Sequence, residues 1–181
     1  MAEQAIRQPL SFAPLPGLRV LAPLARYVLR VDFTAAAGGA GTGVVPISTT
    51  VCRASQLGEW HALWLGPDEQ LLLGPAEAGA TLVAAVYNAL QGVPHSLVDV
   101  SHRQGALEIS GPAAATLLSA ACPLDLGLAA TPVGFCSRTV FGKSEIVLWR
   151  RAEHAFQLEV WRSFLPYVHC LLYTSPSPRD S

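Results

Sequence analysis

The stretch that decides the fold is QGALEISGPAAATLLSAACP, residues 104–123. Apolar residues alternate with others over 105–110, which predicts a β-strand. A Gly-Pro turn then opens an alanine-rich helix, predicted over 112–121, which the following Cys-Pro pair terminates. The same order of strand, Gly-Pro and helix occurs in residues 70–91, either by duplication or because this strand-to-helix turn is common.

Working outward from this stretch, the same patterns predict further elements on both sides. Residues 155–161 alternate, with Phe156, Leu158 and Val160 predicted to face inward and the residues between them, together with Trp161, outward. Ser163 is a good N-cap for a last helix. The other predicted elements are a helix over 75–91 and strands over 26–33, 61–73 (with a turn at 66–68), 97–101, 137–141 and 144–150. These elements predict an α+β fold of mixed or antiparallel sheets with helices packed on one face.

The predicted elements and the prolines divide the chain into four segments. Residues 1–24 contain four prolines and are expected to form an extended arm. Residues 25–96 and 97–169 are predicted to be two α+β subdomains. Residues 170–181, CLLYTSPSPRDS, resemble the in-frame translation of a sequencing-library transposon adapter, so we expect a non-native tail that breaks the last helix.

Composition narrows the class of protein. Only 14% of the 181 residues are charged and 51% are hydrophobic, which suggests that a partner covers part of the surface. The net charge of −1 and the lack of a basic block argue against nucleic-acid binding. No signal peptide or 18-residue apolar stretch is present, and the four cysteines form no C-x-x-C pair, so a cytoplasmic protein without a membrane span is expected.

Motifs for catalysis and cofactor binding are incomplete in this sequence. Gly142-Lys143-Ser144 resembles the end of a phosphate-binding loop, but position 137 is Ser where that motif needs Gly, so a hairpin turn is predicted. The glycines of 38–43 do not fit G-x-G-x-x-G, and the five histidines are scattered. We therefore expect no cofactor and no metal ion to be bound by this chain.

Trp and Arg occur together near the ends of two predicted strands. These residue types, with Tyr, are enriched at the energetic centres of protein interfaces. The sequence therefore predicts an interaction surface, whose residues are Trp149, Arg150, Trp161, Arg162 and Tyr167.

Much of the chain resembles the gamma subunit of heterotetrameric sarcosine oxidase. The residues that carry the resemblance are LVDVSHRQGALEISGPAAATLLSAACPLDL at 97–126, PVGFCSRTVFGKSEIVLW at 132–149 and FQLEVWRSFLPYV at 156–168, with ALWLGPDEQLLLGP at 62–75. That family is related to the folate-binding aminomethyltransferase, the T-protein of glycine cleavage, which implies T-protein-like halves in the fold. Asp125 falls near the T-protein's catalytic carboxylate. The chain is about half a T-protein and lacks most of a folate pocket, so Asp125 is interpreted as a remnant.

The resemblance implies a function for the whole assembly. Such bacterial complexes oxidise sarcosine to glycine and a one-carbon unit, and the gamma subunit is implied to be a non-catalytic structural part beside alpha, beta and delta subunits. FAD, FMN, NAD, tetrahydrofolate and zinc are implied for the complex, and none for this chain. Two alternatives remain: a stand-alone folate-dependent one-carbon protein, for which Asp125 is the only support, and a subunit of a complex acting on another N-methyl amine.

Overall fold

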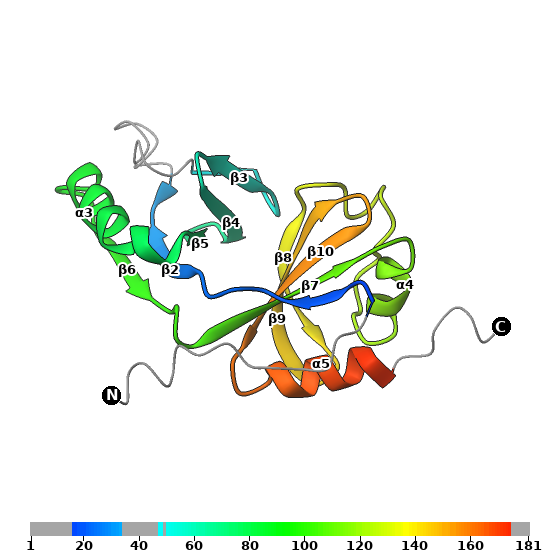
Figure 1. Ribbon diagram of the computed structural model, residues 1–181. Coiled ribbons are helices and arrows are strands. Elements are labelled where there is room, and N and C mark those ends of the chain that lie inside the picture. Colours follow the sequence, from blue (N-terminus) through cyan, green and yellow to red (C-terminus); the bar gives the residue numbers. More distant parts are fainter. Residues whose placement is uncertain (1–15, 34–46, 49, 175–181) are drawn as a thin grey trace, which may run out of the picture. The chain divides into compact units, whose positions relative to one another are not determined.

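The computed structural model describes residues 16–33, 47–48 and 50–174 (Figure 1). The chain divides into two compact units: unit 1 combines residues 1–22 with 102–181, and unit 2 comprises 23–101. Each unit contains a five-stranded sheet in which every neighbouring pair is antiparallel, with helices beside it. The predicted α+β class is therefore confirmed.

Unit 1 is built on a sheet with the strand order β1-β7-β10-β9-β8. Apolar side chains of β7, β9 and β10 share one core with those of both helices, so α4 and α5 cover the same face of the sheet. Its elements are β1 (Leu18–Val20), β7 (Gln104–Ser110), α4 (Ala114–Ser119), β8 (Cys136–Phe141), β9 (Ser144–Ala152), β10 (Ala155–Trp161) and α5 (Leu165–Thr174).

Unit 2 is built on a sheet with the strand order β3-β4-β5-β2-β6. Its core lies between this sheet and α3, whose buried Leu82 and Val86 pack against Tyr27 and Leu29 of β2. Its elements are β2 (Ala25–Val31), β3 (Ala54–Leu57), β4 (Trp60–Gly66), β5 (Glu69–Gly74), the 3-10 helix η1 (Ala76–Ala78), α3 (Gly79–Ala89) and β6 (His95–Asp99). The predicted helix over 75–91 thus consists of η1 and α3. The predicted loop at 38–43 lies outside the described residues.

The boundary between the units differs from the predicted one. The sequence placed it between residues 96 and 97, and the structure places it after Ser101. The reason is that β6 pairs along its whole length with β2, which keeps it in unit 2. The N-terminal arm differs too, since its residues Leu18–Val20 form β1 and pair with β7 in unit 1.

The two Gly-Pro turns require glycine for different physical reasons. Gly111 has φ +112°, a backbone conformation that side chains with a Cβ rarely adopt. Gly74 has no positive φ, but a Cβ there would collide with the indole ring of Trp60. Glycine is therefore required in the unit 1 turn for its backbone conformation, and in the unit 2 turn because the Trp60 ring leaves no space for a side chain.

The last helix, α5, continues into the expected non-native tail. α5 runs to Thr174, so residues 170–174, the first five of the expected non-native tail, are helical. Leu172 is buried in the core of unit 1 and Leu171 packs against that core. Whatever their origin, these five residues belong to the packed unit, and residues 175–181 lie outside the described part.

Across the described ranges, no helix is long and apolar enough to cross a membrane.

Candidate functional site

The five residues predicted to form an interaction surface do not lie together on the surface. Trp161 and Tyr167 are 45% and 38% exposed, and Arg162 is half-buried. Trp149 and Arg150 are only 7% and 3% exposed. The prediction that Arg150 belongs to an exposed Trp–Arg cluster is wrong, because β9 is buried on both faces from Ile146 to Arg150.

The buried guanidinium of Arg150 anchors the loop between α4 and β8. It donates hydrogen bonds to the carbonyl oxygens of Leu126 (3.0 Å), Thr131 (2.5 Å) and Glu153 (2.8 Å), and to the Thr131 hydroxyl. The central carbon of the guanidinium lies 4.6 Å from the ring centroid of Phe156, which is a cation–π contact. Burial lowers the pKa of Arg150 and the nearby Glu153 carboxylate opposes this, while arginine remains protonated in proteins. The side chain is therefore a structural cation that fixes the loop at two points.

Asp125 lies in that same loop, and its carboxylate stabilises a local turn. The side-chain oxygen Oδ1 accepts a hydrogen bond of 2.8 Å from the backbone N–H of Gly127, two residues later. Gly127 in turn accepts bonds from the N–H groups of Ala130 and Thr131. Asp125 is exposed to solvent. The structure thus gives this carboxylate a turn-forming contact.

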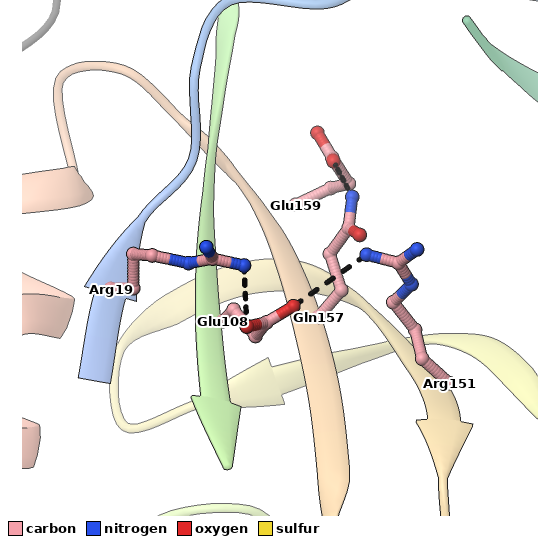
Figure 2. Close-up of polar contacts among 5 residues, drawn as sticks. All are labelled: Arg19, Glu108, Arg151, Gln157 and Glu159. Atoms are coloured by element: carbon pink, nitrogen blue, oxygen red, sulfur yellow. Dashed lines mark hydrogen bonds and ion pairs between the residues drawn. The ribbon is translucent and has the colours of Figure 1, made fainter. Parts of the chain in front are cut away.

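A polar network crosses the sheet of unit 1 (Figure 2). Glu108 of β7 pairs with Arg19 of β1 at 2.8 Å and with Arg151 of β9 at 3.5 Å. On the adjacent strand β10, the side chain of Gln157 donates to the Glu159 carboxylate at 2.6 Å. Both β10 residues are buried, although the alternation predicted them to point outward from the core face. The network joins β1, β7 and β9 through one carboxylate, and this arrangement favours a single strand register.

A second group of residues forms an exposed aromatic and basic surface at the start of α5. We call it the α5 surface and define it by Trp161, Phe164, Tyr167, Arg103, Arg162 and Lys143. The Arg103 guanidinium lies 5.3 Å from the Trp161 ring centroid, and the Arg162 N–H donates to the Arg103 carbonyl at 2.8 Å. The Tyr167 hydroxyl accepts a bond of 3.2 Å from the Lys143 N–H, next to Gly142, where a Cβ would strike that hydroxyl.

Sequence reasoning found part of the α5 surface and missed the rest. Arg103 precedes β7 and Lys143 lies in the β8–β9 hairpin, so only the folded sheet brings them to the end of β10. Phe164 lies two residues after the predicted Trp161-Arg162 pair, and its aromatic character was a usable signal. Within the described part of the chain, no three His, Cys, Asp or Glu side chains gather where they could hold a metal ion.

The fold and this surface define a class: a small α+β protein that exposes an aromatic, basic surface of the kind found at protein interfaces. The model of the sarcosine oxidase gamma subunit family matches residues 30–177. The chain belongs to that family.

Individual relatives agree with the family match. The chain is 37% identical over 141 residues to the sarcosine oxidase gamma subunit of Corynebacterium sp. (strain P-1), covering 77% of this chain and 68% of that one. It resembles the solved heterotetrameric sarcosine oxidase from Corynebacterium sp. U-96 at 30% identity and TM-score 0.73, covering 86% and 81% of the two chains. It also shares its fold with the aminomethyltransferase T of Bartonella henselae, at 12% identity and TM-score 0.65, over 87% of this chain and 45% of that one.

Proposed function

We propose that this chain is the non-catalytic, structural gamma subunit of a heterotetrameric complex that oxidatively demethylates sarcosine to glycine. Membership of the sarcosine oxidase gamma subunit family supports the assignment to this type of complex. The related structure from Corynebacterium sp. U-96 is a heterotetramer, which supports assembly with companion subunits.

The observation that carries the structural role is the contact of Asp125. A general base needs a carboxylate positioned against a bound substrate. Here the carboxylate accepts a hydrogen bond from the Gly127 N–H, and Arg150 donates hydrogen bonds to the Leu126 and Thr131 carbonyls of the same loop. This contact supports a turn-forming role for Asp125 in place of the chemistry of the corresponding T-protein carboxylate.

The α5 surface is the proposed contact with the rest of the complex. Trp161, Phe164 and Tyr167 together expose large aromatic area on a protein whose charged content is only 14%. Aromatic side chains with adjacent arginines release much binding free energy when a partner excludes water from them. The backbone N–H of Arg162 donates to the Arg103 carbonyl in this surface, and the interface role of Arg162 is part of this proposal.

The remaining parts of the proposal concern the whole complex. Alpha, beta and delta subunits are the proposed companions, and FAD, FMN, NAD, tetrahydrofolate and zinc are assigned to the complex and none to this chain. The assembly is proposed to be cytoplasmic, where free thiols such as the four of this chain persist.

Two measurements on the assembled complex test this proposal. The tagged full chain, co-expressed with its companion subunits, should co-purify with them, and the isolated chain should be colourless and unable to oxidise sarcosine. Asp125→Ala should leave the turnover of the complex nearly unchanged, whereas loss of a general base costs a factor of roughly 10²–10⁴. A loss of that size with assembly intact would overturn the structural role.

The contact surface has its own test. Trp161→Ala combined with Arg162→Ala should reduce co-purification while the isolated variant keeps the circular dichroism spectrum of the wild type. Tyr173→Ala is the control, because Tyr173 is an aromatic of α5 that is even more exposed than Trp161 (59% against 45%) and lies outside the α5 surface.

A further inference from the structure

The aromatic residues of the α5 surface follow one another at intervals of three residues. Trp161 ends β10, Phe164 donates its N–H to the Trp161 carbonyl at 2.8 Å, and Val168 donates to the Phe164 carbonyl at 2.9 Å. Phe164 directly precedes α5 and Tyr167 lies in its first turn, where side chains three residues apart are neighbours. Trp161 is the last residue of β10, and the turn at 162–164 connects it to Phe164. Phe164 is 42% exposed, comparable to the other two aromatics, so three rings are available to a partner at the entrance of the helix.

Positive charge frames these rings, and acidic residues are absent from the segment that carries them. Residues 160–174 contain no Asp or Glu. Arg103 lies over the Trp161 ring and Lys143 is exposed beside Tyr167, so each end of the aromatic row has a cation. The neighbouring carboxylates of unit 1 are engaged elsewhere: Glu145 pairs with Arg138, and Glu159 is buried and bonded to Gln157.

This charge pattern selects the chemistry of the partner. We propose that the α5 surface receives an acidic element of a companion subunit, whose Asp or Glu side chains pair with Arg103 and Lys143 while its apolar side chains cover the three rings. The proposal rests on the assembly role proposed above. Complementary charge at an interface favours the correct encounter and disfavours wrong partners.

The same charges argue against a second copy of this chain as the occupant. In a two-fold symmetric dimer each surface contacts its own copy, so Arg103 and Lys143 would meet cations of an identical surface. Like charges placed opposite each other at an interface are unfavourable. Nucleic acid also binds aromatic and basic surfaces, but it needs a positive groove that follows many phosphates, and here the framing cations are Arg103, Arg162 and Lys143 on a chain of net charge −1.

The test uses the complex assembled by co-expression of the full chain with its companion subunits. Arg103→Glu combined with Lys143→Glu reverses the charge of the surface. Arg30→Glu combined with Arg151→Glu is the matched control, with the same change in net charge at ion-paired arginines outside the α5 surface. The purified complexes are diluted at about 50 and about 500 mM NaCl, between which surface charge interactions become strongly screened, and the fraction retaining the chain is measured by mass photometry.

The expected result is a wild-type complex that dissociates more readily at high salt. The reversal variant should bind at least about tenfold more weakly at low salt, where one factor of ten corresponds to about 1.4 kcal/mol, and should lose most of the salt dependence. The control should behave as the wild type. Should the reversal variant fail to fold by circular dichroism, Arg103→Gln with Lys143→Gln takes its place, with a smaller loss of affinity expected.

The outcomes separate the inference from the proposed function. A wild-type chain that does not assemble contradicts the proposed function itself. Normal assembly of the reversal variant, with unchanged salt dependence, overturns the acidic partner while leaving the structural role standing. If Trp161→Ala weakens binding to the complex while the charge reversal has no effect, the acidic partner is overturned equally, because the element that covers the surface would then be apolar. Tighter binding of the isolated chain to a labelled single-stranded oligonucleotide than to the companion subunits also refutes it.

Discussion

Replacing Arg150 by Met should destabilise unit 1 more than any other change of a single arginine in it. Methionine has a similar length and is apolar, so it fills the space but donates no hydrogen bond. The carbonyl oxygens of Leu126, Thr131 and Glu153 then lose the guanidinium that they share. Hydrogen bonds that involve a charged group are each worth about 1.5–3 kcal/mol.

The individual bonds of Arg150 do not add, because one side chain makes them all and the variant no longer buries a charge. We therefore expect a loss of about 3 kcal/mol in the free energy of unfolding, near the lower end for breaking a buried charged contact. For a chain of this length, 1 kcal/mol corresponds to about 2–4 °C, so Tm should fall by about 6–12 °C. The Arg150 side chain is almost completely buried, so solvent screening reduces this value little.

The assay is urea unfolding of the isolated chain, followed by circular dichroism. Amide hydrogen exchange in residues 124–135 should rise as well, since this loop loses its two anchor points. Arg151→Met is the control, because the adjacent arginine is exposed and makes a 3.5 Å ion pair with Glu108 and a cation–π contact 5.0 Å from the Trp149 ring centroid. Contacts of these two kinds at the surface are worth about 0–1 kcal/mol each. Equal losses for the two variants would refute the reasoning. So would full stability of Arg150→Lys, whose single ammonium group cannot reproduce the fork of bonds.

Three further outcomes follow from the buried residues of unit 1. Leu172→Ala should cost about 2–5 kcal/mol in urea unfolding, while Tyr173→Ala costs far less, and equal effects would contradict the packing of α5. Burial lowers the pKa of His169 below its ordinary 6.5, so as pH falls the unfolded chain binds a proton before the folded chain does. The free energy of unfolding should therefore decrease as pH drops below about 6.5. His169→Gln should flatten this pH dependence, and an unchanged profile would exclude His169 as its source. Burial raises the pKa of the Cys122 thiol above 9.0. In the native protein at neutral pH, iodoacetamide should therefore modify the exposed Cys170 well before Cys122, as followed by mass spectrometry. The reverse order of modification would contradict the burial of Cys122.

Periodicity located most strands because a strand's two faces alternate along the chain. It found β10 within the predicted bounds and placed Phe156, Leu158 and Val160 on the core face. It did not indicate that Gln157 and Glu159 on the opposite face are buried as well. Alternation separates the two faces of a strand, and whether the second face is covered depends on tertiary contacts that a local pattern does not contain.

The errors at β1 and at Arg150 have the same physical origin. β1 is three residues long and lies among prolines, so its assignment to a sheet depends on pairing with β7, far away in the sequence. Arg150 and Arg151 are adjacent, and the sequence alone does not distinguish these two arginines at the end of a strand. The folded structure buries Arg150 under the loop between α4 and β8 and leaves Arg151 exposed. The family resemblance gave the overall assignment correctly because it draws on several ordered motifs rather than on one residue.

The pairing of β1 with β7 has a consequence for how the chain folds during synthesis. Residues 23–101 form a continuous segment that leaves the ribosome as a unit, and its pairing is local to that segment. β1 leaves first, yet its partner follows only after that whole segment, and β7 then pairs on its other side with β10 near the C-terminus. Because domains generally fold as they emerge, we expect unit 2 to form on the nascent chain while Leu18–Val20 waits without a strand partner. The first described strand to be translated is therefore among the last to be paired, because unit 1 cannot close before β7 and β10 have left the ribosome.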